Sequence, residues 1–264
     1  MRKRISRRLM AERKILRAIS PAVESICRPP KLDSIKRALF IQPHPDDNQI
    51  AAGGTIAKLV ASGVEVFELT VLDDRYTDLS YSGEGYTVRQ KEALAAQECL
   101  GMKNAGFLGF GDRTPASARE ISVAIVKVLR EIKPDAVFTA DPNLENECHE
   151  DHIKVADAVK YAVLDATFNF YPEYIDGKPR QDTWKVGTIA FYYTDKANTV
   201  VDISEYEELK MQAIGCHRSQ MVPGFKELIK LLAQQFAAET LYESVEVFRV
   251  ISAFHTHCFN LPVG

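Results

Sequence analysis

Short apolar runs alternate with longer stretches of helical period over most of the chain. From position 35 onward, β-branched or apolar runs alternate with segments whose apolar residues recur every three or four positions. The expected strands span 38–42, 64–72, 105–110, 135–140, 188–193, 199–203 and 245–251. The expected helices span 49–62, 87–100, 117–132, 151–166, 204–216 and 224–238. This alternation predicts right-handed βαβ units in an α/β, Rossmann-like, doubly wound and mostly parallel sheet flanked by helices.

The ends of these segments carry turn signals. Gly63 and Gly101 each follow a helical stretch, where glycine commonly ends a helix. Residues 167–187 are rich in aromatic residues, Pro and Gly and show neither period, so we expect a long functional loop or lid there. The last apolar run, 245–251, is expected to close an edge of the sheet.

The chain begins with a strongly basic segment. Residues 1–20 carry eight Lys or Arg residues and the single acid Glu12, a net charge of +7, which leaves −10 for the rest of a chain whose net charge is −3. We interpret residues 1–35 as a basic, helical extension that packs on the acidic body or on a neighbouring subunit. A membrane-surface helix is the alternative, although its apolar face is thin. Residues 36–264 form one domain, because no Ser/Gly/Pro-rich linker divides them.

Composition narrows the class of protein. With 264 residues and 46% apolar composition the chain can bury a full core, and its acidic body does not suit general nucleic-acid binding. The five cysteines are scattered and form no Cys-x-x-Cys pair, which favours a reducing, cytoplasmic compartment. No apolar run approaches the roughly 20 residues of a transmembrane span, so we expect a soluble, unexported protein.

Two polar clusters follow predicted strands. The first is His44-Pro45-Asp46-Asp47, directly after the strand 38–42 and before a helix. The second is His149-Glu150-Asp151-His152, after the strand 135–140 and at the start of the next helix. Parallel strands deliver their carboxyl ends to one edge of a sheet, so the clusters can meet there. A His and carboxylate set at such a place is a plausible zinc site.

Each of these residues also has an ordinary structural explanation. A lone His is more often a surface or hydrogen-bonded residue than a metal ligand, and Asp46-Asp47 before a helix can serve as an N-cap. The combination of both clusters at strand-to-helix turns favours a functional site over these readings.

Four motifs in order resemble those of one family. His44-Pro45-Asp46-Asp47 with Ala52-Gly53-Gly54-Thr55-Ile56 is similar to the first motif of the LmbE-like or PIG-L family of zinc-dependent N-acetylglucosaminyl deacetylases, and His149–His152 resembles the second. Further matching positions are Arg89, Glu92, Leu100-Gly101, Phe107–Asp112, and Lys210, Ala213, His217, Ser219 and Gln220. The resemblance covers about residues 36 to 255, and Tyr192–Lys196 to Val201–Ile203 is particularly similar to the diacetylchitobiose deacetylase branch. At position 48 this chain has Asn, where many members of the family carry an acidic residue. The supporting contact that this acid makes in the family is therefore left open here.

The resemblance implies a role for each matching residue. His44, Asp47 and His152 would bind Zn²⁺, or another divalent metal. Asp46 would be the general base, and His149 would stabilise the oxyanion. Asp151 would orient a ligand histidine or cap its helix.

Substrate contacts are also implied by the resemblance. Arg89 and Asp112 would hold sugar hydroxyls, and aromatic side chains of 167–187 would stack on a sugar ring or simply pack. His217 would either fix a helix or line the cavity. A homo-oligomer is expected, in which a terminal tail with His255 and His257 could reach a neighbouring subunit's pocket.

The predicted function is hydrolysis of an N-acetyl group from an amino sugar or glycoconjugate, a small-molecule substrate. One alternative is a metal-dependent amidase that acts on another N-acyl compound or a thiol conjugate. Another is a metal-binding or sugar-binding module without turnover. Asp46 separates these, since a pure binding site does not need a carboxylate beside three complete ligands. A nucleotide-binding Rossmann enzyme is disfavoured, because no Gly-x-Gly-x-x-Gly follows a strand.

Overall fold

The computed structural model describes residue 14 and residues 31–74, 84–171, 177–179 and 181–256. Most of the basic N-terminal extension, and His257 at the other end, lie outside the described residues. Among the helices that are described, none combines the length and the hydropathy that a membrane span requires.

Every predicted strand and helix from residue 35 onward is present, with bounds shifted by a few residues. The strands are β1 (Arg37–Gln42), β2 (Glu65–Asp73), β3 (Lys103–Gly111), β4 (Ala136–Ala140), β5 (Thr188–Tyr192), β6 (Thr199–Asp202) and β7 (Val245–Ser252). The α-helices are α2 (Asp47–Ala61), α3 (Val88–Leu100), α4 (Ala118–Ile132), α5 (Glu150–Asp165), α6 (Glu207–Ile214) and α7 (Phe225–Ala237). Short 3₁₀ turns lie at Leu32–Ser34, Arg218–Gln220 and Ala253–Thr256.

The strands form one sheet in the order β3-β2-β1-β4-β5-β7-β6. The first five are parallel to their neighbours, which confirms the predicted doubly wound architecture, whereas β7 pairs antiparallel with both β5 and β6. The expectation that 245–251 closes an edge is wrong: β7 lies between β5 and β6, and β6 is the edge strand. The strand order reverses between β1 and β4, which is where open α/β sheets place their ligands.

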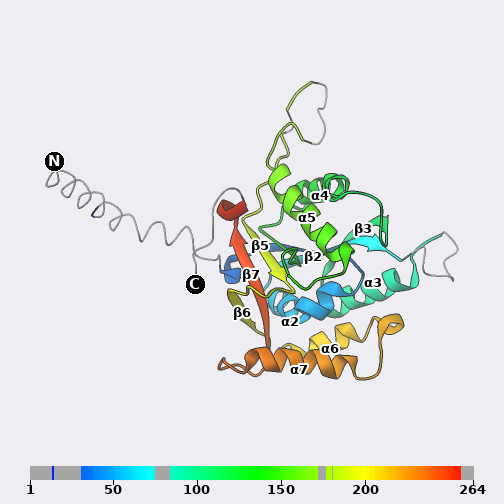
Figure 1. Ribbon diagram of the computed structural model, residues 1–264, viewed down its shortest axis with the longest axis vertical. Coiled ribbons are helices and arrows are strands. Elements are labelled where there is room, and N and C mark those ends of the chain that lie inside the picture. Colours follow the sequence, from blue (N-terminus) through cyan, green and yellow to red (C-terminus); the bar gives the residue numbers. More distant parts are fainter. Residues whose placement is uncertain (1–13, 15–30, 75–83, 172–176, 180, 257–264) are drawn as a thin grey trace.

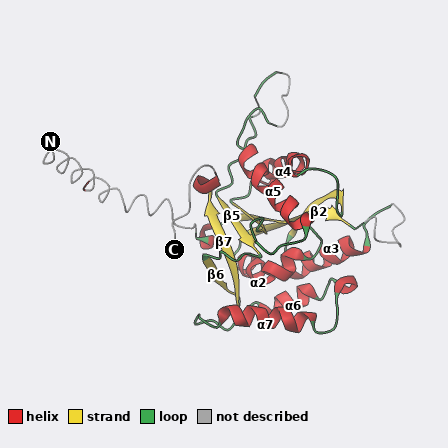
Figure 2. Cartoon of the chain, viewed as in Figure 1, coloured by secondary structure: helices red, strands yellow, loops and turns green. Residues whose placement is uncertain are grey.

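Helices cover both faces of the sheet (Figures 1 and 2). On one face α4 and α5 pack against a core that includes Leu39 and Ile41 of β1, and on the other α2 packs against Ala38 and Phe40 of the same strand. Alternate residues of a strand point to opposite faces, so a nearly continuous apolar run such as β1 can bury both sides. Helices α6 and α7 lie outside α2 and α3, and α7 also contacts β7.

Local sequence signals explain where several helices begin and end. Thr87 and Gln90 form a capping box at the start of α3, and Ser117 and Glu120 form another at α4. Gly101 ends α3 in the left-handed conformation, with a φ of 72°.

The glycine pair of the first motif allows close packing of α2. A Cβ at Gly54 would lie 2.7 Å from Cβ of Ile203, and one at Gly53 would lie 2.9 Å from Cγ of Lys210. The absence of side chains therefore lets α6 and the end of β6 approach the helix that follows the first polar cluster.

The aromatic segment 167–187 leaves α5 at the end remote from His152. Trp184 Nε1 donates to the carbonyl of Pro134 at 2.7 Å, and the amide of Gly187 donates to the carbonyl of Asp135. These partners lie before β4, at the opposite edge of the sheet from its carboxyl end. The described part of this segment therefore does not close over the predicted site, and the lid interpretation is wrong for it.

Candidate active site

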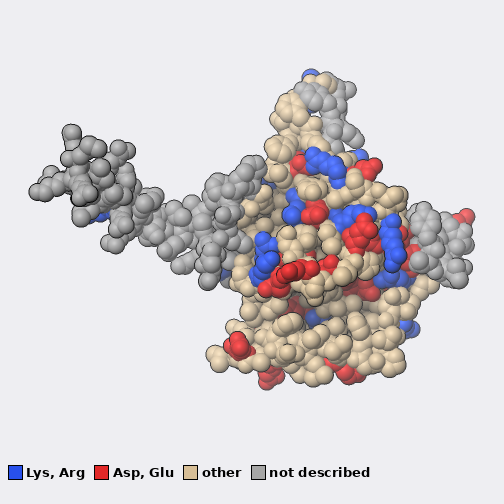
Figure 3. Space-filling view, in the orientation of Figure 1, with Lys and Arg blue, Asp and Glu red and all other residues tan. Residues whose placement is uncertain are grey.

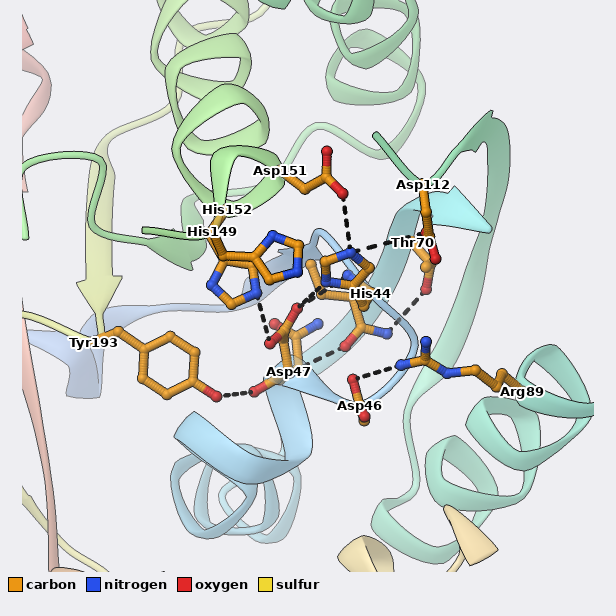
Figure 4. A network of polar contacts seen from close by, with 12 residues as sticks. His44, Asp46, Asp47, Thr70, Arg89, Asp112, His149, Asp151, His152 and Tyr193 are labelled. Carbon is orange, nitrogen blue, oxygen red and sulfur yellow. Dashed lines mark hydrogen bonds and ion pairs between the residues drawn. The ribbon is translucent and has the colours of Figure 1, made fainter. Parts of the chain in front are cut away.

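The two polar clusters meet at the carboxyl edge of the sheet (Figure 4). The turn after β1 supplies His44, Asp46 and Asp47, and the start of α5 supplies His149 and His152. Because β1 and β4 are neighbours, segments about a hundred residues apart in the sequence lie on either side of the point where the strand order reverses.

Asp47 is the link between the clusters. Its Oδ2 accepts the backbone N–H of His44 at 3.0 Å and lies 3.5 Å from Nδ1 of that imidazole. Its Oδ1 lies 3.5 Å from Nε2 of His152. The side chain is only 6% exposed, so a carboxylate faces two imidazole nitrogens in a nearly closed space.

The second nitrogen of each imidazole faces another carboxylate. Nε2 of His44 lies 3.4 Å from Oδ2 of Asp151, and Nδ1 of His152 lies 2.9 Å from Oε2 of Glu147. A carboxylate on one ring nitrogen fixes the tautomer that leaves a lone pair on the other, and metal-binding histidines are usually held in this way. The donor set of His44, Asp47 and His152 therefore fits a divalent metal ion.

Two groups of donor atoms in the described residues lie close enough to share an ion. One is His44, His149 and His152, and the other is His44, Asp112 and Asp151. Nε2 of His44 faces both carboxylates of the second group, Asp151 and Asp112, whereas its Nδ1 faces Asp47, which belongs to neither group.

Asp46 lies beside this donor set and is held by a cation. Nη2 of Arg89, from the first turn of α3, donates to its Oδ1 at 3.1 Å. Arg89, predicted to hold a sugar hydroxyl, thus contacts the predicted base. Its Nε is buried and has no hydrogen-bond partner among the described residues.

Burial and charge shift the pKa values of the turn after β1. Burial and the Asp47 carboxylate raise the pKa of Asp46 to about 6, against the opposing charges of Arg89 and His44. Burial lowers the pKa of His44, but its contact with Asp47 and the charges of Asp47 and Asp112 outweigh this and raise it to about 9. The turn is thus a set of strongly interacting groups, as is common at reacting centres.

His149 and Asp112 complete the predicted set. His149 is exposed and stacks on His152, with ring centroids 4.6 Å apart, while its centroid lies 4.7 Å from that of His44. Partial burial of the ring against its neighbours, together with the charges of the two other imidazoles, lowers the pKa of His149. Asp112, at the end of β3, has Oδ1 3.8 Å from Nε2 of His44. All seven predicted residues therefore lie around one centre.

Tyr193, which follows β5, borders the same centre. Its hydroxyl donates to the carbonyl of Asp47 at 3.5 Å, and its ring stacks at 6.2 Å on His152. Its φ of 51° is unusual for a bulky residue, and such backbone conformations cluster at functional sites.

A buried carboxylate from β2 supports the first turn. Glu68, fully buried, accepts amide N–H groups from Asn48 at 3.0 Å, Gln49 at 2.8 Å and Gln97 at 2.9 Å. Burial raises the pKa of Glu68. Asn48, which replaces the acidic residue of the family motif, thus contacts an acid on the neighbouring strand β2.

Two of these supporting residues, Glu147 and Glu68, are not predicted by the sequence motifs. Glu147 lies five positions before His152 in a polar loop, and Glu68 lies inside an apolar strand. A charged residue within a buried strand is the one signal that could have singled out Glu68, because unpaired charge is rarely buried.

The remaining histidines occupy different places. His217 is fully buried before the 3₁₀ turn at Arg218–Gln220, and burial, with the charge of Arg89, lowers its pKa to about 4. The same turn is fixed to α3 by Ser219, which donates through its N–H and hydroxyl to Glu92. Nδ1 of His255 lies 2.8 Å from the Ser252 hydroxyl, at the end of β7.

The chain is similar to known proteins in sequence and in structure. The family described as PIG-L, GlcNAc-PI de-N-acetylase, matches residues 39–163. The diacetylchitobiose deacetylase of Thermococcus kodakarensis is 34% identical over 236 residues, which cover 85% of this chain and 86% of that protein. A 1D-myo-inositol 2-acetamido-2-deoxy-alpha-D-glucopyranoside deacetylase of Rhodococcus erythropolis is 31% identical, with 66% of this chain and 68% of that protein covered.

A solved structure agrees with these relatives. The N,N'-diacetylchitobiose deacetylase from Pyrococcus horikoshii, in complex with an inhibitor, superposes with a TM-score of 0.74 at 30% identity. The match covers 85% of this chain and 86% of that one. Most of the described domain therefore has a counterpart in a single solved protein.

Proposed function

The chain belongs to the PIG-L family of deacetylases, and we propose that it hydrolyses the N-acetyl amide of an N-acetylglucosamine-type sugar or glycoconjugate with the help of a bound divalent metal ion. The observation that carries the proposal is the convergence of His44, Asp47 and His152 beside Asp46. The relatives named above act on compounds of this class, with different groups attached to the sugar.

Zinc suits the proposed site, because His44, Asp47 and His152 offer two imidazole nitrogens and one carboxylate and leave room for a further ligand. Other divalent ions accept the same donors. When bound, such an ion supplies Lewis-acid chemistry, which acidifies a water molecule and polarises an amide carbonyl. We favour this set over His44, Asp112 and Asp151, because Asp47 faces both imidazoles at 3.5 Å.

Asp46 is the proposed general base and acid. Its carboxylate takes a proton from the attacking water and later gives one to the nitrogen of the leaving amine. The contact with Arg89 holds Oδ1 in one place, which leaves Oδ2 for the proton transfer. A carboxylate fixed in this way loses little conformational freedom on reaching the transition state.

The other residues bind or stabilise. His149 stands at the exposed side of the centre, where an imidazole N–H can donate to the oxyanion that forms on the carbonyl oxygen. The buried Nε of Arg89 and Oδ1 of Asp112 have no hydrogen-bond partner among the described residues, so they suit the hydroxyl groups of a sugar.

An acetate-release assay with matched variants tests the proposal. Zinc-loaded protein is offered N-acetylglucosamine, its disaccharide and its glycosides, and metal content is measured by mass spectrometry. Asp46→Asn is expected to keep the metal and lose at least a hundredfold in kcat, a typical contribution of acid–base catalysis. His152→Ala is expected to lose both metal and activity, while Asp112→Asn keeps the metal. Normal turnover by Asp46→Asn would contradict the mechanism. Loss of metal from Asp112→Asn would instead assign the ion to His44, Asp112 and Asp151.

A further inference from the structure

Two thiols lie in contact where α6 packs along α3 (Figure 1). Cys99 belongs to the last turn of α3, and Cys216 directly follows the end of α6. The S–H group of Cys99 donates to the sulfur of Cys216, whose Sγ lies 3.6 Å from the carbonyl oxygen of Gln212. The two sulfurs, more than a hundred residues apart in the sequence, are therefore neighbours in space.

A second contact holds the same two segments together. Ser219, three residues after Cys216, donates to Glu92 through its backbone N–H at 2.8 Å and through its hydroxyl at 2.6 Å. Glu92 lies on α3 about two turns before Cys99. A disulfide requires that the backbones be close and that the side chains face each other. Here the surrounding structure already fixes that approach.

Both thiols are within reach of a reagent. Cys99 and Cys216 are partly exposed, and neither is in a disulfide. A Cβ at Gly215 would lie 3.6 Å from Nζ of the exposed Lys226, so a cation stands next to Cys216. Figure 3 shows few acidic side chains over α6 and α7 on the face that it draws. Partly exposed, electropositive surroundings of this kind are typical of cysteines that react.

The two thiols differ in how readily they lose a proton. Burial, together with the charge of Cys216 and the hydrogen bond to it, raises the pKa of Cys99. The thiolate is the species that attacks a disulfide. Cys99 therefore keeps its proton, and Cys216 is the thiol that reacts first with an external disulfide.

We propose that Cys99 and Cys216 are a modification site, at which a low-molecular-weight disulfide such as oxidised glutathione forms a reversible bridge between α3 and the end of α6. The sulfur of Cys216 attacks the small disulfide and expels one small thiolate. The sulfur of Cys99 then attacks Cys216 in the mixed disulfide and expels the second. Each released thiolate takes up the proton that the attacking cysteine loses, so the two cysteines are oxidised by two electrons and the small disulfide is reduced to two thiols.

Peptide mapping of the whole protein tests the proposal. The protein is treated with oxidised glutathione, its remaining thiols are alkylated, and trypsin then places Cys99 in peptide 92–103 and Cys216 in peptide 211–218, each with a single cysteine. The two peptides are expected as one disulfide-linked species that dithiothreitol separates. Alkylation of both peptides, or a bond from either to another cysteine, would overturn the proposal. So would a bridge found only in cross-linked dimers on non-reducing electrophoresis.

Two variants test the order of attack and the choice of partner. Cys99→Ser removes the second thiol, so the reaction is expected to stop with glutathione attached to Cys216. Its matched control is Cys148→Ser, because Cys148 is exposed and contacts the carbonyl of Asn146. This control is expected to form the bridge in the same yield as the wild type. Absence of glutathione from Cys216 in Cys99→Ser, or loss of the bridge in Cys148→Ser, would overturn the assignment.

The bridge is expected to stabilise the fold. It closes a loop of more than a hundred residues and so restricts the unfolded chain, which should raise the midpoint of thermal unfolding by several degrees relative to the reduced protein. Cys99→Ser treated in the same way should show no such rise. An unchanged midpoint in the bridged wild type would contradict a clamp between α3 and α6. None of these measurements uses a substrate, so their outcome is independent of the proposed function.

Discussion

The two halves of the sheet use charged residues in opposite ways. In the parallel half, β3-β2-β1-β4-β5, charged groups gather beyond the strand ends and face one another around a centre bordered by the exposed His149, as Asp46, Asp47 and His152 do. In the antiparallel half, Glu246 of β7 is paired at 2.7 Å with Lys210 of the neighbouring helix α6, and both residues are nearly inaccessible. Charged residues thus support the fold where they are paired with an opposite charge and enclosed, and they form the proposed reacting centre where several of them face one another at the carboxyl edge of the sheet.

The largest expected effect is on the antiparallel half. Lys210→Met leaves the Glu246 carboxylate buried without its cation, and breaking a buried pair in this way costs about 3–5 kcal/mol of unfolding free energy. Guanidinium unfolding of both proteins measures the loss.

Its control is an exposed pair in the parallel half. Lys103 contacts Glu65 at 2.7 Å, but its side chain is 58% exposed, so Lys103→Met should cost at most about 1 kcal/mol. Similar losses in the two variants would mean that enclosure does not distinguish these pairs.

A smaller effect is expected at the proposed active site, where the quantity that changes is metal affinity and not the free energy of unfolding. Glu147→Gln removes the charge that holds Nδ1 of His152, so metal affinity should fall about 10- to 100-fold, the usual cost of losing such a partner. Competition with a chromophoric chelator measures the affinity.

The matched control lies on the same segment. Glu150, whose side chain is 76% exposed, contacts Lys154, and Glu150→Gln should leave metal affinity unchanged. Unchanged affinity in Glu147→Gln as well would show that Glu147 does not orient the ligand.

The smallest effect is expected at the opposite edge of the parallel half. Trp184→Phe removes the hydrogen bond to the carbonyl of Pro134 and should cost about 1 kcal/mol of unfolding free energy. Because this edge is remote from the reacting centre, kcat/KM should not change. A fall in kcat/KM without a loss of stability would restore a role for the aromatic segment in the site.

The sequence predicts the parallel half well. The spacing of apolar residues located the strands and helices. The strand-to-helix turns indicated that His44 and His152 lie at the same edge of the sheet, because all parallel strands end on one side. Four motifs in order led to the family, which the comparisons confirm together with its deacetylase activity. These residues could be found because the first cluster directly follows β1, and the second follows the loop after β4 and stands at the start of the next helix.

The antiparallel end was decided by tertiary structure. The pattern of apolar residues predicts that β7 is a strand, but it does not show which strands pair with it. The insertion of β7 between β5 and β6 depends on which edges of the sheet remain open once the parallel units have packed. Partners such as Lys210 with Glu246, or Asn48 with Glu68, come from different strands and helices and are chosen by proximity in space.

Sequence by itself thus determined the elements, the edge of the sheet at which the two polar clusters meet and the candidate ligand residues offered there. Tertiary structure decided which carboxylate holds each imidazole and how α7 and β7 build an apolar cavity beside them. The physical reason is that periodicity records only whether a residue faces the core, whereas hydrogen-bond partners and cavities arise from several segments that share no sequence neighbourhood.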